Sequence, residues 1–236
     1  MIKELVKQGL KKFGLELRAL NSPTRSFSNA VAQLKKEIYP QTIIDIGVAE
    51  GTPDLYEQYP NHPYLLVEAN PAYQPALESL QKQLNAIVET VFCGEKKGET
   101  AFNIYEDPRK SSSYEISRNL TLKEQKTVPV ETLDSLIEKH ALTGPFLLKI
   151  DVEGAEIDVI KGATQTLQAC EAIIAEASIL PKLKDGPEFA DLVTTLHAKG
   201  FSVFDIAAGS NHQQSGKLLQ VDLIFVKTEA KFRQIN

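Results

Sequence analysis

The sequence has no apolar run near the roughly 20 residues that a membrane-spanning helix needs, and only two cysteines, Cys93 and Cys170. These cysteines form no spaced metal-binding or redox pattern, so we expect two buried free thiols in a reducing compartment. Basic residues are not in excess either, because the net charge is -5 and the pI is near 5.5. This balance argues against a protein that coats nucleic acids, whose footprint is usually basic.

The opening segment, residues 1–20, lacks the uninterrupted apolar core and the cleavage site of a secretory signal, so the cytoplasm is the expected location. Its apolar residues nevertheless recur at helical spacing beside several lysines and an arginine. We expect such a helix to pack on the domain or on a second subunit, as in a homodimer. Contact of residues 1–20 with an anionic membrane surface is the alternative.

Short apolar stretches alternate with helical patterns along most of the chain, which at 236 residues suits one large domain. Such alternation is typical of an α/β fold with a mostly parallel sheet and helices on both faces. We expect an N-terminal helical segment, residues 1–39, and one domain, residues 40–236. The expected main strands are 42–47, 64–71, 86–94, 145–151, 171–179, 201–206 and 220–227.

The helices are expected between these strands, except at the end of the chain. No helical pattern separates the last two strands, so they should form an antiparallel hairpin around the polar loop 207–217. Residues 100–106 alternate apolar and polar side chains, like an edge or hairpin strand. The expected helices are 28–38, 72–84, 130–140, 188–200 and one that follows the fourth strand.

A glycine turn after the first strand and an acid after the second mark a ligand site at the carboxyl ends of the strands. Asp45 closes the first strand, Gly47 and Gly51 allow a close backbone approach, and Glu68 suits the two hydroxyls of a ribose. A dinucleotide site prefers G-x-G-x-x-G, whose helix N-terminus neutralises a pyrophosphate. Here Glu50 adds an anion, which is unfavourable beside pyrophosphate but harmless beside a sulfonium. The turn therefore favours S-adenosylmethionine over NAD, with a purely structural glycine turn as the alternative.

Five stretches together resemble the FkbM-type S-adenosylmethionine-dependent methyltransferases, over about residues 42–226. The most specific signal is the Lys-x-Asp-x-Glu-Gly-x-Glu run at residues 149–156, whereas the glycine turn alone would be weak. The resemblance implies a class I methyltransferase (Rossmann-like) fold with a seven-stranded sheet and an antiparallel last strand. It also implies methyl transfer, usually to oxygen on a sugar, polyketide or other small molecule. The stretches are "TIIDIGVAEGT", "YLLVEANP", "SSSYE", "VPVETLDSL" and "LLKIDVEGAEIDVIKGA".

The resemblance also implies roles for individual residues at the cofactor. Asp45, Gly47 and Gly51 would hold its methionine end, and Glu68 its ribose. Cys93 and Gly94 would lie along the adenine. One departure is Ala49, because many family members have Asn there, so a side-chain contact to the cofactor is missing or replaced.

The run 149–156 and its neighbour Asp158 place several acids at the exit of a buried strand. Lys149 lies inside that strand and needs a partner, because an unpaired buried ammonium costs several kcal/mol. Asp151, Asp45 or Glu156 is the expected partner. Glu156 and Asp158 are expected at a helix N-terminus, where unpaired amides and the helix dipole stabilise acids, with Lys161 as a partner of Asp158. This structural role explains them at least as well as a functional role does.

Methyl transfer to an alcohol needs a group that takes the hydroxyl proton. The candidates are Asp151, which should face the methyl group, Glu153 in the following turn, and His212 in the loop 207–217. The spacing demands no metal, although Asp151 and Glu153 could hold a divalent cation. The serine loop 111–115 either closes over the cofactor or the acceptor, or is simply a flexible loop, which is the commoner case.

Two other functions stay open at this point. A nucleotide-dependent oxidoreductase could use a similar sheet, but Glu50 and the missing third glycine disfavour it. A non-catalytic cofactor-binding or membrane-associated module could use the basic first helix. The favoured function is an O-methyltransferase for a small molecule or sugar, whose acceptor the sequence does not identify.

Overall fold

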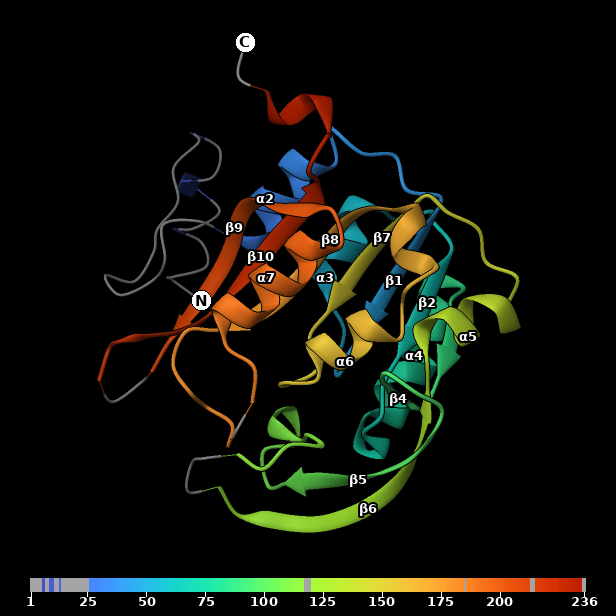
Figure 1. Ribbon diagram of the computed structural model, residues 1–236, viewed down its shortest axis with the longest axis vertical. Coiled ribbons are helices and arrows are strands. Elements are labelled where there is room, and N and C mark those ends of the chain that lie inside the picture. Colours follow the sequence, from blue (N-terminus) through green and yellow to red (C-terminus); the bar gives the residue numbers. More distant parts are fainter. Residues whose placement is uncertain are drawn as a thin grey trace.

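The computed structural model describes residues 6, 9–10, 13, 26–116, 120–184, 186–212 and 215–234. Its main sheet has seven strands in the order β3-β2-β1-β7-β8-β10-β9 (Figure 1). Strands β3, β2, β1, β7 and β8 are parallel, whereas β10 runs antiparallel to both β8 and β9. The strands are β1 Thr42–Ile46, β2 Tyr64–Val67, β3 Ile87–Glu89, β7 Phe146–Ile150, β8 Cys170–Ser178, β9 Phe201–Asn211 and β10 Leu218–Lys227. The expected seven-stranded sheet and its final hairpin are confirmed. The strand expected at 86–94 is divided, because only Ile87–Glu89 belongs to this sheet.

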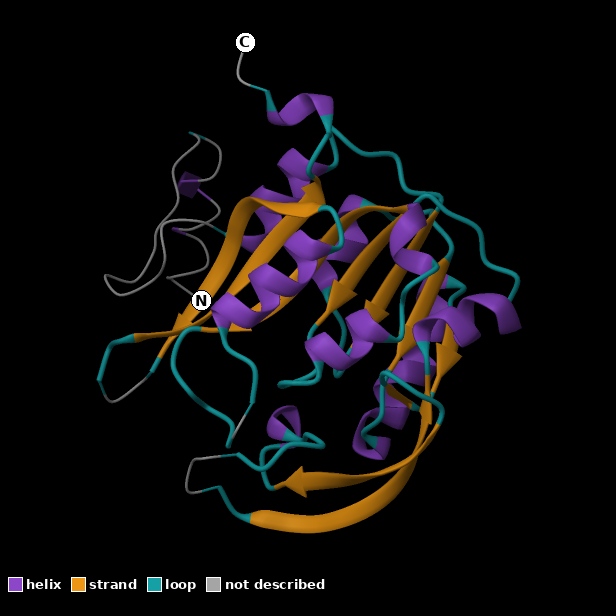
Figure 2. Cartoon of the chain, in the orientation of Figure 1, coloured by secondary structure: helices purple, strands orange, loops and turns teal. Residues whose placement is uncertain are grey.

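Helices cover both faces of this sheet (Figure 2). The α-helices are α2 Phe27–Leu34, α3 Pro53–Gln58, α4 Gln74–Leu84, α5 Leu133–Lys139, α6 Glu156–Lys161 and α7 Phe189–Ala198. Short 3-10 helices are η1 Pro71–Tyr73, η2 Pro108–Lys110, η3 Thr166–Ala169 and η4 Lys231–Arg233. Helix α3, which the sequence patterns did not indicate, begins at a proline, a residue well suited to a first helical turn.

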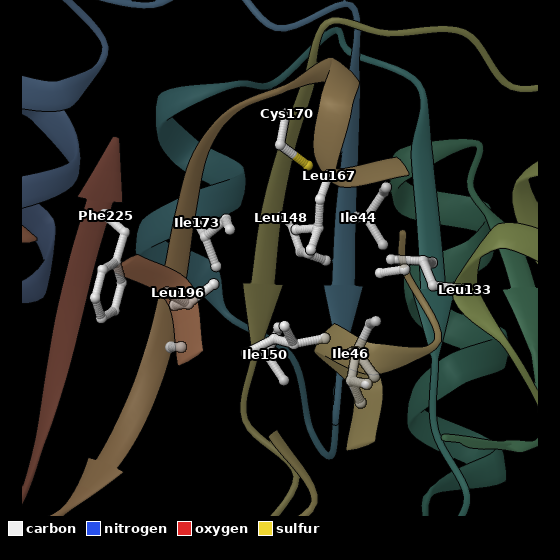
Figure 3. Close-up of a cluster of buried hydrophobic side chains, with 14 of the residues drawn as sticks. Ile44, Ile46, Leu133, Leu148, Ile150, Leu167, Cys170, Ile173, Leu196 and Phe225 are labelled. Carbon is white, nitrogen blue, oxygen red and sulfur yellow. The ribbon is translucent and has the colours of Figure 1, made fainter. Parts of the chain in front are cut away.

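Alternate residues of the central strands enter two separate cores, because side chains of a strand point to opposite faces. On one face, Ile44, Leu148 and Ile173 pack with residues of α5, α6 and α7 such as Leu133 and Leu196 (Figure 3). On the other face, the intervening residues pack with α2, α3 and α4. Burial on both sides is the reason why these strands are continuous apolar runs.

A second sheet of three strands lies across the carboxyl ends of β1 and β7 (Figure 1). It consists of β4 Phe92–Cys93, β6 Leu122–Glu131 and β5 Gly98–Tyr105, and its Phe92 and Phe102 pack with Ala155 after β7. The strand expected at 100–106 is confirmed as β5. Strand β6 was not expected, because most of its residues are exposed and it lacks an apolar pattern. This sheet forms a wall beside the strand ends where ligands bind in such folds.

Other expectations need adjustment near the chain ends. Strand β9 continues to Asn211, so the loop expected at 207–217 is shorter than predicted. In the segment 1–39, helix α2 packs Val31 and Leu34 into the same core as Ile43. The amphipathic pattern at 1–20 falls outside the described residues except at 6, 9–10 and 13, so its packing stays a prediction. None of the helices in the described part of the chain has the length and apolar character to cross a bilayer.

Candidate active site

A cavity of about 440 Å³ opens at the carboxyl ends of the central strands. Gly47, Glu68 and Asp151, which follow β1, β2 and β7, line one part of it. The lining continues to Glu176 on β8 and Asp222 on β10. The volume falls within the range of small-molecule sites, and the place is the one that open α/β sheets use for ligands.

The glycine turn after β1 fits closely against the turn after β7. Gly47 has a φ of +80°, and a Cβ atom there would lie 1.8 Å from the main-chain oxygen of Asp151. Gly51 has a φ of +106° and also lines the cavity. Ala49 also has a positive φ, 48°, a conformation in which Asn is enriched. The Asn of many family members is therefore explained at least in part by the backbone.

Glu68 is held in one orientation at the cavity. Its Oε2 accepts a hydrogen bond from the Ala49 amide at 2.8 Å, and its Oε1 accepts one from the Asn70 amide at 2.7 Å. Burial raises the pKa of Glu68 above its ordinary value, whereas the two amide hydrogen bonds oppose that shift. A carboxylate oxygen has more than one lone pair, so each oxygen can accept a further hydrogen bond from a ligand.

Asp45 lies behind the cavity and does not line it. Its side chain is fully buried and accepts hydrogen bonds from Thr52 Oγ1 at 2.9 Å, Tyr56 OH at 2.6 Å and Lys149 Nζ at 3.2 Å. Asp45 therefore has no direct contact with the cavity. It instead accepts hydrogen bonds from Thr52 and Lys149, which both line the cavity. Of the two residues expected along the adenine, Cys93 lines the cavity and Gly94 does not.

Lys149 has the carboxylate partners that its burial required. Its Nζ lies 3.2 Å from Asp45 Oδ1 and 3.4 Å from Asp151 Oδ2, so two of its three predicted partners are confirmed. Glu156, the third, accepts a hydrogen bond from the Gly154 amide instead. Burial alone would lower the pKa of Lys149, but the charges of Asp45 and Asp151 raise it above its ordinary value. Lys149 thus stays charged and orients both acids.

Asp151 and Glu153 differ in how freely they face the cavity. The Asp151 side chain is 40% exposed and meets only Lys149 among the described ion pairs. Glu153 is buried, and its carboxylate is held by Lys110 and by Lys182, whose Nζ lies 3.0 Å from Oε2. Asp151 is therefore the more exposed and less constrained of the two acids.

Residues 45–203 match the family model of the methyltransferase FkbM domain, which is more than half of the chain. The chain belongs to the FkbM methyltransferase family. It is also 38% identical over 58 residues to the hexuronic acid methyltransferase AglP of Haloferax volcanii, and this match covers 24% of each protein. The chain thus spans about a quarter of the length of that curated relative.

The chain also resembles solved structures at low sequence identity. Precorrin-6y C5,15-methyltransferase from Geobacter metallireducens is 15% identical with a TM-score of 0.46, over 89% of this chain and 93% of that one. The 1,6-didemethyltoxoflavin-N1-methyltransferase of Burkholderia thailandensis, solved with S-adenosylhomocysteine, is 10% identical with a TM-score of 0.44, over 87% and 80% of the two chains.

Beyond Asp151 the cavity is lined by Glu176, Gln220 and Asp222, which the sequence patterns missed. Lys182 Nζ lies within hydrogen-bonding distance of Glu176, of Glu153 and of Gln220, and Gln220 donates to Glu176. Glu176 on β8 faces Asp222 on β10 in the antiparallel register. The local signal for Glu176 and Asp222 was weak: each is an acid inside a largely apolar strand, Glu176 in "EAIIAEASI" and Asp222 in "QVDLIFVK".

His212 lies away from the cavity lining. It follows β9, its main-chain N donates to the oxygen of Lys217 at 2.8 Å, and its Nδ1 is 3.0 Å from Ser215 Oγ. A proton acceptor must be within hydrogen-bonding reach of the proton that it takes. The structure therefore gives His212 no geometry for the role predicted from its loop position.

The serine loop is anchored at the cavity. Ser111 and Ser112 are buried, Ser111 Oγ accepts a hydrogen bond from Asn70 Nδ2 at 3.1 Å, and Ser112 Oγ donates to the Glu153 main-chain oxygen at 2.7 Å. Because Ser111 also lines the cavity, the anchored start of the loop forms part of the cavity wall. Closure of the loop over a cofactor or an acceptor stays a prediction.

Cys93 and Cys170 are free and buried, and burial raises the pKa of both thiols to about 12. In the part of the chain that the structure describes, no group of three or more His, Cys, Asp or Glu residues is arranged to hold a metal ion.

The burial of Glu156 predicts that the stability of the protein depends on pH. Burial raises the pKa of Glu156 from 4.5 to about 7, so its contribution to stability is complete below about 4.5 and is lost as the pH rises through about 7. Glu156→Gln keeps an acceptor for the Gly154 amide without the charge. We expect this variant to be more stable than wild type by about 3 kcal/mol at about pH 8, and no more stable at about pH 4. Urea unfolding at both pH values checks this, and equal stabilities at high pH would contradict it.

Proposed function

We propose that this methyltransferase transfers a methyl group from S-adenosylmethionine to a hydroxyl group of a small molecule or sugar. The observation that carries the proposal is one cavity that joins Glu68, the Gly47 turn and Asp151. When bound, the cofactor supplies an electrophilic methyl group on a positively charged sulfur. Glu68 offers two oriented oxygens to the ribose hydroxyls, and Gly47 leaves the backbone open where a side chain would intrude.

The helix after the glycine turn supports this donor over a dinucleotide. Pyrophosphate sites use free amides at a helix N-terminus. Here α3 begins with Pro53, which has no N–H, and carries Asp54 in its first turn, and both residues line the cavity. An anion at this point repels phosphate but tolerates a sulfonium and an ammonium group. The oxidoreductase alternative is correspondingly weaker.

Asp151 is the proposed proton acceptor. Lys149 holds one of its oxygens at 3.4 Å, and the other oxygen takes part in no hydrogen bond within the described residues. Bound S-adenosylmethionine would supply the methyl group to the acceptor oxygen and leave as the neutral thioether, which keeps the electron pair of the broken bond. Asp151 would accept the proton that the acceptor oxygen loses. The enzyme's main tasks are alignment of the two reactants and removal of this proton.

Asp151→Asn tests the donor and the proton acceptor together. We expect the variant to bind S-adenosylhomocysteine within a few-fold of wild type, while transfer of labelled methyl to fractions of a cell extract falls by about 100-fold or more. The matched control is Glu68→Gln, which should instead weaken S-adenosylhomocysteine binding, because it disturbs the ribose contact. Calorimetric titration and a radiolabel assay give the two readouts.

Three results would count against these assignments. Binding of NAD in preference to S-adenosylhomocysteine would refute the donor. Undiminished transfer by Asp151→Asn would refute its role in proton transfer. Equal S-adenosylhomocysteine affinity of Glu68→Gln and wild type would refute the ribose contact. Location in the cytoplasm and assembly as a homodimer stay predictions from the sequence.

A further inference from the structure

The cavity extends beyond the residues assigned to the donor. Past Asp151 it reaches Glu176, Gln220 and Asp222, which lie on β8 and β10, the next strands in the sheet order after β7. Phe27 at the start of α2 lines the same cavity. Because the donor occupies the tips of β1, β2 and β7 in the proposed function, this remaining part is where the acceptor lies.

Asp222 is the acid of this region without a partner. Glu176 contacts Lys182 and Gln220, and Glu153 contacts two lysines. Asp222, in contrast, takes part in no side-chain hydrogen bond or ion pair within the described residues, although its side chain lines the cavity. A partly buried carboxylate without a partner is costly, and such groups are frequent at functional sites.

The surroundings of Asp222 disfavour its charged form. Its pKa is raised to about 6, chiefly by burial and also by the charge of Asp151, while Lys149 and Lys182 act in the opposite direction. Glu176 faces it from β8. Asp222 therefore remains largely ionised at neutral pH, when it can only accept hydrogen bonds.

The cations of the cavity are already committed to the protein's own acids. Lys149 pairs with Asp45 and Asp151, and Lys110 pairs with Glu153. Arg109 pairs with Asp107. Each lysine or arginine side chain among the described lining residues is thus neutralised, whereas Asp222 is a free anion.

We infer that Asp222 is a specificity-determining residue that selects an uncharged, hydroxyl-rich acceptor by accepting a hydrogen bond from a hydroxyl other than the one methylated. This inference rests on the proposed function and deepens it. A second hydroxyl donates to the free carboxylate, and the ring of Phe27 offers an apolar surface in the same cavity. An acceptor with its own carboxylate would meet Asp222 without a free cation to offset the repulsion.

The test measures binding of matched sugars to the enzyme saturated with S-adenosylhomocysteine. The probes are the methyl glycosides of glucose, galactose and mannose and the methyl glycosides of the corresponding uronic acids, observed by saturation-transfer NMR. We expect at least one neutral glycoside to bind, and its uronic counterpart to bind about tenfold more weakly or not at all. Asp222→Asn should weaken binding of the neutral glycoside about tenfold. It should also reduce the difference in affinity between the neutral glycoside and its uronic counterpart. S-adenosylhomocysteine affinity should be unchanged.

Glu99→Gln is the matched control, because it removes one negative charge from an exposed position on β5. It should leave all sugar affinities as in wild type. The inference falls if the uronic sugars bind more tightly, if Asp222→Asn leaves the neutral sugar unaffected, or if no neutral glycoside binds while S-adenosylhomocysteine does. Failure of S-adenosylhomocysteine itself to bind would instead overturn the proposed function, and the inference with it.

Discussion

Lys149→Met should lower the free energy of unfolding by about 3–5 kcal/mol, because it removes one partner of a buried ion pair. Asp45 is fully buried, and Lys149 is its cationic partner at 3.2 Å. Methionine fills the space of the lysine stem but leaves the Asp45 charge with only the hydroxyl donors of Thr52 and Tyr56. Asp151 would also lose the group that orients it, so methyl transfer should fall together with stability.

Urea unfolding of a double-mutant cycle separates the charge from the packing. Asp45→Asn combined with Lys149→Met removes both charges, so the double variant should be more stable than Lys149→Met alone. A loss below about 1 kcal/mol for Lys149→Met would show that the pair matters little for stability. A double variant less stable than both single variants would show that packing, and not an uncompensated charge, dominates.

Gly47→Ala should both destabilise the protein by about 3 kcal/mol and abolish tight cofactor binding. The added methyl group would lie 1.8 Å from the main-chain oxygen of Asp151, which is far inside the contact distance. Neither turn can easily yield, because the Asp151 amide is itself hydrogen-bonded to the Ile46 oxygen at 2.9 Å. Any shift that relieves the clash moves the floor of the cavity.

Gly200→Ala is the matched control for the backbone strain alone. Gly200 has a φ of +83°, close to the +80° of Gly47, but no atom lies within 4 Å of its added Cβ. Gly200→Ala should lower the free energy of unfolding by only about 1–2 kcal/mol, which is the penalty of the left-handed conformation. It should leave S-adenosylhomocysteine binding intact. Thermal unfolding and calorimetric titration of both variants decide the matter. Equal losses of stability and of S-adenosylhomocysteine affinity in the two variants would mean that the contact with Asp151 contributes nothing to either loss.

Local patterns in the sequence predicted most of the main sheet and the donor side of the site. Strands such as β1 and β7 are buried on both faces, so they appear as continuous apolar runs that need no tertiary information. Gly47 and Glu68 follow such runs directly, and the carboxyl ends of parallel strands share one edge. Strand β6 gave no such signal, because pairing with β5 and not burial makes it a strand.

Local sequence also determined that Lys149 needs acidic partners, since a lysine in an apolar strand cannot remain buried alone. Only the tertiary structure decided which acids face the cavity. It placed Asp45 behind the lining and His212 outside it, and it brought Asp222 opposite Glu176 through the register of β8 and β10. A single acid in a strand does not reveal its cross-strand neighbour, because long-range pairing sets that contact and the intervening sequence does not encode it locally.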